Sequence, residues 1–338
     1  MNRMVNSSTI VLIVVAVFFL APVEAQRAKR PNQRGKNDSA SVQAVLWHEP
    51  SDIMTRDLLY GQGGKEHEPK GNFKFIEEDT GGSNPKFNIK DEQGARWKVK
   101  LGVEAQPETV ATRLLWAVGY FTDEDYYLSA LHVEGMKKLQ RGQNLISAEG
   151  TTQGARLERH IKDRKKIGSW SWFENPFVGT RELNGLKVMM ALINNADLKK
   201  ENNSIYGERG FEHRYVVSDL GASFGKTGNI LTRSIGNLKD YAESKFTRTI
   251  RPGYVDFVMR TRPPFLFFFR VLYYFDRARM EKIVQHIPRD DARWMGQLLA
   301  RLSNKQIQDA FRAGGYSPHE VAGFSQKLCE RIAELNNL

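Results

Sequence analysis

The stretch from residue 197 to residue 202 contains side chains that can support proton transfer and cation binding. It holds Asp197, Lys199 and Asn202, and a further aspartate, Asp219, follows later in the chain. A carboxylate can accept the proton of a hydroxyl, Asp and Asn oxygens suit hard divalent cations, and a lysine ammonium is a point charge for a phosphate. A polar loop between a helix and a hairpin is the alternative interpretation.

A helix and a strand are predicted on the two sides of this stretch. Apolar residues recur at helical spacing before it, namely Leu183, Leu186, Met189, Met190 and Ile193, and this pattern predicts a core helix. The apolar run 215–217 predicts a strand, and residues 219–221 follow it directly. Residues 197–202 are therefore expected to form a loop between a buried helix and a buried strand.

This order of motifs resembles the protein-kinase-like superfamily. Residues 197–202 match the kinase catalytic loop D-L-K-P-E-N except at Lys200, and residues 219–221 match the D-F-G triplet except at Leu220. The resemblance implies an α+β, two-lobed fold. Its small N-terminal lobe would be rich in β-strands and carry one key helix, and its larger C-terminal lobe would be mainly helical.

The same resemblance implies roles for four residues. Phosphoryl transfer requires a protein mainly to position groups and to neutralise charge. Asp197 would orient the attacking hydroxyl and accept its proton, and Lys199 would meet the transferring phosphate. Asn202 and Asp219 would hold Mg²⁺ or Mn²⁺ against the phosphate oxygens.

The chain between residues 73 and 101 predicts three short strands joined by turns, because apolar and polar residues alternate there. The first turn contains Gly81, Gly82 and Ser83. Glycine lets backbone N–H groups approach a phosphate closely, and the arrangement resembles the start of a kinase small lobe. The resemblance implies that these three residues bind the nucleotide, and a plain hairpin turn is the alternative.

Lys98 and Lys100 project from the same face of the third predicted strand. A kinase needs one lysine here to grip the nucleotide phosphates. We assign that role to Lys100, because residues 100–104 resemble the lysine-x-glycine-acidic pattern of phosphatidylinositol kinases. Lys98 is expected to be a solvated lysine.

A helix is predicted over residues 107–119, with proline at its start and glycine at its end. The same residues resemble the glutamate-bearing helix of HipA-type kinases. The resemblance implies an ion pair between Glu108 and Lys100, with Glu104 as the second candidate. Dipole compensation in a first helical turn is the alternative role for Glu108.

The chain departs from protein kinases at Ala196 and again after Gly225. Ala196 replaces the arginine that usually precedes the catalytic aspartate, and no A-P-E motif follows Gly225.

The apolar run 263–275 is expected to be a buried helix, because Arg270 interrupts it and it is too short to span a membrane. The final helix is predicted to begin with a capping box at Ser317.

The first residues of the chain predict export. Residues 1–25 combine a positive start, an apolar run and small residues before a cleavage point at Ala25–Gln26. A secreted or periplasmic location is expected, and an uncleaved N-terminal membrane anchor is the alternative. Residues 26–45 predict a basic disordered arm, followed by a small lobe at 46–135 and a large lobe at 136–338.

The composition limits the partners. The 338 residues carry a formal net charge of +11, which suits an anionic partner. Part of this charge lies in the arm, so no specific nucleic-acid binding is expected. The single cysteine, Cys329, excludes a disulfide within the chain, and no transmembrane span is expected in the mature chain.

The predicted function is an exported phosphotransferase that uses ATP with Mg²⁺ or Mn²⁺. Its acceptor would be a hydroxyl on a protein, glycan or lipid, and an acidic acceptor would suit the basic arm. Three alternatives stay open: an inactive kinase-like binding protein at the cell envelope, a relative that transfers AMP, and one that activates a carboxylate. The sequence leaves the oligomeric state undetermined.

Overall fold

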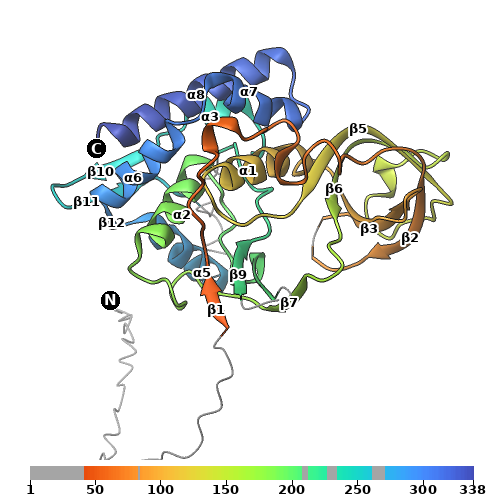
Figure 1. Ribbon diagram of the computed structural model, residues 1–338, viewed down its shortest axis with the longest axis horizontal. Coiled ribbons are helices and arrows are strands. Elements are labelled where there is room, and N and C mark those ends of the chain that lie inside the picture. The colour runs from red at the N-terminus through yellow and green to blue at the C-terminus, as the bar shows by residue number, and fades with distance from the viewer. Residues whose placement is uncertain (1–41, 83, 208–211, 227–233, 261–270) are drawn as a thin grey trace, which may run out of the picture. The chain divides into compact units, whose positions relative to one another are not determined.

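The computed structural model describes residues 42–82, 84–207, 212–226, 234–260 and 271–338 (Figure 1). The described residues all belong to one compact unit. Several expectations concern residues outside these ranges: the signal sequence at 1–25, most of the arm, Ser83, and residues 263–270 of the apolar run.

Five strands close into a barrel in the order β2-β3-β4-β6-β5. Their bounds are β2 Phe73–Asp79, β3 Lys86–Asp91, β4 Arg96–Leu101, β5 Asp125–Glu134 and β6 Thr151–Arg159. The predicted strands are β2, β3 and β4. Because side chains alternate along a strand, Trp97, Val99 and Leu101 of β4 lie in the buried barrel core, and Lys98 and Lys100 lie on the opposite face.

The barrel extends beyond the lobe boundary predicted at residue 135. β6 pairs antiparallel with both β4 and β5, so closure of the barrel requires residues up to Arg159. At the other end, β1 (Gln43–Val45) pairs in parallel with β9 (Glu212–Val217). The last residues of the predicted arm therefore form a strand. Both differences arise from pairing between segments that are distant in the sequence.

Helix α1 (Ala105–Ala117) packs against β5, β6 and helix α7 (Asn304–Ala313). It begins before the expected start at Pro107. Gly119 follows its end with φ of 97°, in the left-handed region that glycine adopts without strain. The carbonyl of Gly119 accepts a hydrogen bond from His48 N at 3.0 Å. This hydrogen bond joins the end of the helix to the N-terminal segment.

A second sheet, in the order β1-β9-β8-β7, carries the predicted catalytic loop. Its other strands are β7 Lys165–Gly168 and β8 Asn203–Gly207. Helix α2 (Arg181–Leu192) precedes the loop, and a short 3-10 helix at Lys200–Asn202 leads into β8. The predicted order of core helix, loop and apolar strand is confirmed, with β8 inserted between the loop and β9.

The remaining elements make the C-terminal part mainly helical (Figure 1). They are α3 Leu238–Glu243, β10 Thr247–Ile250, β11 Tyr254–Phe257, α5 Val271–Glu281, β12 Ile287–Pro288, α6 Arg289–Leu299 and α8 Pro318–Asn336. Four further 3-10 helices lie at Ile53–Thr55, Gly61–Gly63, Gln143–Leu145 and Lys282–Val284. The predicted capping box is present, because Ser317 accepts from Glu320 N and the Glu320 side chain accepts in return. Across the described ranges, no helix combines the length and the apolar character that crossing a membrane demands.

An aromatic cluster connects the segment after Asp219 to the C-terminal helices. The Phe224 ring lies 5.4 Å from Tyr241, 5.4 Å from Phe311 and 6.0 Å from Phe324, centroid to centroid. Phe224 N also donates to Ile193 O at 2.7 Å. The cluster therefore fixes the segment that carries Asp219 against both α8 and the end of α2.

Replacement of Phe324 with alanine tests the importance of this cluster. Phe324→Ala should lower the free energy of unfolding by about 3–5 kcal/mol, because it removes a fully buried ring and leaves a cavity. Urea unfolding measures the loss. Gln326→Ala, at an exposed position of the same helix, should change it by no more than about 0.5 kcal/mol. Equal effects of the two substitutions would contradict the assignment.

Candidate active site

A cavity of about 610 Å³ is lined by residues of the barrel, α1 and the second sheet. Seven predicted site residues line it: Gly82, Lys100, Glu108, Asp197, Lys199, Asn202 and Asp219. Gly81 is exposed in the turn and is not among the lining residues, and Ser83 lies outside the described ranges. The fold thus brings Lys100 and Asp219 to one cavity, although they lie more than a hundred residues apart in the sequence.

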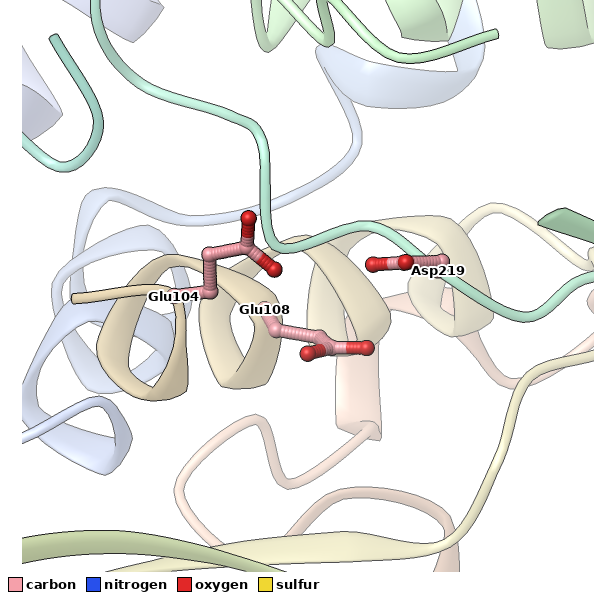
Figure 2. A group of neighbouring side chains, drawn as sticks. All are labelled: Glu104, Glu108 and Asp219. Carbon is pink, nitrogen blue, oxygen red and sulfur yellow. The ribbon is translucent and has the colours of Figure 1, made fainter. Parts of the chain in front are cut away.

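Lys100 lies at the centre of a group of carboxylates. Its Nζ is 2.8 Å from Glu108 Oε2, 2.9 Å from Glu104 Oε2 and 3.1 Å from Asp219 Oδ1. Figure 2 shows Glu104 and Glu108 at the start of α1 and Asp219 on the loop after β9. The expected Lys100–Glu108 ion pair is present, and Glu104, the second candidate, contacts the same ammonium group.

The charges in this group determine one another's ionisation. Burial by itself would lower the pKa of Lys100, but Glu108, Asp219 and Glu104 outweigh burial and raise that pKa. Burial opposes ionisation of Asp219, yet the adjacent Lys100 holds the pKa of Asp219 below its usual value. Burial raises the pKa of Glu108, and Arg156 and Lys100 oppose that rise. Lys100 is therefore cationic at neutral pH and keeps Asp219 ionised.

Arg156 on β6 is a site residue that the sequence analysis missed. It is the register partner of Lys100 on β4, lines the cavity, and lies 3.6 Å from Glu108 Oε1. Its Nε donates to Asp125 Oδ2 at 2.7 Å, and Asp125 Oδ1 accepts from Arg113 Nη1 of α1 at 3.0 Å. This buried network attaches the glutamate-bearing helix to the barrel. No local pattern marks Arg156, because its importance comes from the pairing of β6 with β4.

The loop at 197–202 is held by its own side chains. Asn202 Nδ2 donates to Asp197 O at 2.7 Å and to Asp197 Oδ2 at 3.1 Å. Lys199 Nζ lies 3.1 Å from Asp197 Oδ1. Asn202 O accepts from Ser218 N at 2.8 Å, which places the loop beside Asp219. The amide nitrogen of Asn202 is thus engaged, and its amide oxygen is the atom that can meet a cation.

Arg277 of α5 is a second residue that sequence reasoning missed. Its Nη1 lies 3.0 Å from Asp197 Oδ1 and donates to Ala196 O at 2.8 Å. Its side chain is 5% exposed. The chain lacks an arginine at Ala196, and Arg277 brings a guanidinium to Asp197 from a distant helix. None of the motifs recognised in the sequence includes Arg277. Its contact with Asp197 joins residues that are far apart in the chain, so no local pattern could have indicated it.

A third arginine, Arg331 of α8, holds the start of the loop. It is fully buried, and its Nη1 donates to Leu192 O at 2.7 Å and to Asn194 Oδ1 at 3.1 Å. Its Nη2 donates to Ser244 Oγ at 2.6 Å, and its guanidinium lies 4.2 Å from the ring centre of Tyr241. Asn194 has a φ of 52°, an uncommon conformation for a side-chain-bearing residue. Arg331 stabilises the backbone at that point.

Lys98 differs from its expectation as a solvated lysine. It lines the cavity, and its Nζ lies 3.6 Å from Glu158 Oε1 on β6. Glu158 and the neighbouring Asp123 raise the pKa of Lys98, against the effect of partial burial. The pairing of β4 with β6, which places Lys98 opposite Glu158, is the physical reason for the difference.

The oxygen atoms at the Asp219 end of the cavity fit a hard divalent cation. Carboxylate oxygens of Glu104, Glu108 and Asp219 lie within 4.8 Å of one another, but one oxygen of each already contacts the Lys100 ammonium group. Asn202 lines the same cavity. Asp219 contacts Lys100 through Oδ1, so Asp219 Oδ2 and the amide oxygen of Asn202 are the atoms that could meet a cation. Oxygen ligands of this kind are those that Mg²⁺ or Mn²⁺ prefers.

Together the barrel, the glutamate-bearing helix, the 197–202 loop and the 219–221 segment belong to an α+β architecture with a β-rich N-terminal region and a mainly helical C-terminal region, as the sequence predicts. No protein-family model matches the chain, and no curated protein matches it.

The solved structures that are similar to this chain include two kinases. One is the Helicobacter pylori proinflammatory kinase CtkA, with 12% identity and a TM-score of 0.45, covering 80% of this chain and 98% of that one. The other is the Golgi casein kinase, with 8% identity and a TM-score of 0.38, covering 79% of this chain and 73% of that one. Since a fold does not determine a function, neither similarity assigns an activity to this chain.

Replacement of Arg277 tests its role in holding the 197–202 loop. Arg277→Ala should lower the free energy of unfolding by about 2 kcal/mol, because Asp197 loses a charge-assisted partner. It should also raise amide hydrogen exchange in residues 196–202. The control is Arg279→Ala on the same helix, where an exposed guanidinium lies 4.8 Å from the Phe173 ring centre and the loss should stay below about 1 kcal/mol. Unchanged exchange in Arg277→Ala would contradict the role.

Proposed function

We propose that this chain is a phosphotransferase of the atypical kinase type, which uses ATP with Mg²⁺ or Mn²⁺ to phosphorylate a hydroxyl. The observation that supports this most is the convergence of Lys100, Asp197 and Asp219 on one cavity. These side chains come from the barrel, the loop after α2 and the end of β9. The acceptor would be found outside the cytoplasm, given the export signal expected at residues 1–25.

In the proposed complex, Lys100 contacts the phosphates of the nucleotide. Glu108 holds the ammonium group in place from α1 at 2.8 Å, so that the charge is positioned before the nucleotide enters. Asp219 and Asn202 would hold the divalent cation, which when bound neutralises charge on the phosphate oxygens. The turn at Gly82 borders the same end of the cavity.

Asp197 is the proposed acceptor of the hydroxyl proton. The acceptor oxygen forms a bond to the terminal phosphorus, the bond from that phosphorus to the nucleoside diphosphate breaks, and the hydroxyl proton passes to the Asp197 carboxylate. Lys199 and Arg277, at 3.1 Å and 3.0 Å from Asp197 Oδ1, fix the direction of that carboxylate. Lys199 also lines the cavity and can follow the charge on the transferring group.

Nucleotide binding is the first test. ATP with Mg²⁺ at a hundredfold excess over its Kd should raise the free energy of unfolding of the mature chain by about 2.7 kcal/mol, measured by urea unfolding. Asp219→Asn should lose most of this increase. Asp290→Asn, at an exposed position of α6, should retain it. Absence of any increase with the unmodified chain would overturn the proposal.

Group transfer is the second test. The mature chain, ATP and Mn²⁺ are incubated with fractionated envelope proteins, glycans and lipids, and mass spectrometry follows the products. Added phosphate supports the proposal, added AMP supports the AMP-transferring alternative, and no addition supports an inactive binding protein. Asp197→Ala should lower phosphate transfer by at least about a hundredfold. Undiminished transfer would show that Asp197 is not the base.

A further inference from the structure

At the end of the cavity beyond Lys100, every described lining residue carries a polar side chain. No aliphatic side chain appears among the described residues that line the cavity. The lining residues at the second end are Lys98, Asp123, Glu158, Lys166, Ser204 and Tyr206. Small-molecule sites are usually lined by apolar side chains with a few polar groups, so this end is built for a ligand that is recognised by hydrogen bonds.

Lys98 and Glu158 form the accessible pair at this end. Their charged atoms are 3.6 Å apart, and their side chains are 42% and 20% exposed. A ligand in the cavity can therefore reach both. Glu158 is also held by Arg156 Nη1 at 3.2 Å, so its carboxylate stays in place when Lys98 turns toward a ligand.

Both members of the pair are charged at neutral pH. Burial would raise the pKa of Glu158, but Arg156, Lys98 and Arg164 outweigh burial and lower it. The coulombic effect of Glu158 in turn raises the pKa of Lys98. The pair thus offers a strong hydrogen-bond donor directly beside a strong acceptor.

In the proposed function, on which this inference rests, the nucleotide phosphates lie at Lys100, Asn202 and Asp219. A nucleotide anchored there directs its base toward Lys98 and Glu158. We infer that the site accepts purine and pyrimidine nucleoside triphosphates with similar affinity, because Lys98 and Glu158 can pair with any base and no described lining residue forms an apolar slot of fixed shape.

The chemistry of the bases explains the tolerance. Each base presents an acceptor next to a donor on its pairing edge: the ring nitrogen and amino group of adenine or cytosine, and the oxo group and ring N–H of guanine or uracil. The ammonium of Lys98 can donate to the acceptor and the carboxylate of Glu158 can accept from the donor in all four cases. A pair on flexible side chains therefore does not distinguish among them.

Tyr206 adds to this tolerance. It has the only aromatic ring among the described lining residues, and the guanidinium of Arg164 lies 3.8 Å from the ring centre on one side. A base that stacks on the other side gains affinity without selectivity, because every base has a π-face. Most of the selectivity for the ligand then lies at the phosphate end, where Lys86, Lys100 and Lys199 line the cavity.

Isothermal titration of the mature chain with Mg²⁺ and ATP, GTP, CTP, UTP or inorganic tripolyphosphate tests the inference. The four nucleotides should bind with Kd values within about threefold of one another, and tripolyphosphate should compete with each. ATP binding about tenfold or more tighter than the other three would overturn the inference and leave the proposed function in place. Failure of every nucleotide to bind would overturn the proposed function itself.

A single variant tests the role of Lys98. Lys98→Met should weaken all four nucleotides by about fivefold and leave tripolyphosphate within twofold of its original affinity, because only the base loses a contact. Lys90→Met, an exposed lysine on β3 outside the cavity, should change none of these affinities. A loss confined to one base would overturn the inference. An equal loss for tripolyphosphate would also overturn it, since Lys98 would then be a phosphate ligand.

Discussion

The ammonium group of Lys100 and the three carboxylates around it form the interaction on which the rest of the site depends. Removing a lysine from water costs several kcal/mol unless oppositely charged partners compensate for it, and Lys100 is only 5% exposed. Its partners come from the start of α1 and from the loop after β9. The charges stabilise one another only when the β4 strand, α1 and this loop take their observed positions, so one electrostatic requirement fixes three separate parts of the chain.

The 197–202 loop depends on a second group of buried charges, contributed by the helices α5 and α8. Arg277 of α5 contacts Ala196 and Asp197, and Arg331 of α8 contacts the turn at Asn194. Guanidinium groups can donate several hydrogen bonds in a fixed plane, so each arginine holds backbone and side-chain oxygens at once. The C-terminal third, which lacks the familiar kinase motifs, thereby has a direct part in positioning the loop.

The polar lining of the cavity follows from the same kind of pairing between buried charges. Arg156 is shared between Glu108, which contacts Lys100, and Glu158, which contacts Lys98, so the two ends of the cavity belong to one connected charge network. Charged groups that are already paired and oriented can act on a ligand without reorganising. The network therefore offers preorganised polar contacts to a ligand in the cavity.

The sequence alone determined the features that depend on neighbouring residues. Three features are of this kind: the spacing of Asp197 and Asn202, the alternation of side chains that turns Lys100 away from the barrel core, and the capping box at Ser317. Each involves residues only a few positions apart. Their hydrogen bonds and faces follow from local geometry.

Only the tertiary structure decided which distant segments meet. The extension of the barrel to β6, the strand at Gln43–Val45, and the contacts of Arg156, Arg277 and Lys98 all depend on partners far away in the chain. The sequence around a charged side chain does not indicate which distant residue of opposite charge will pair with it. That is settled by strand pairing and helix packing, because a buried charge is stable only where the complete fold brings its partner to it.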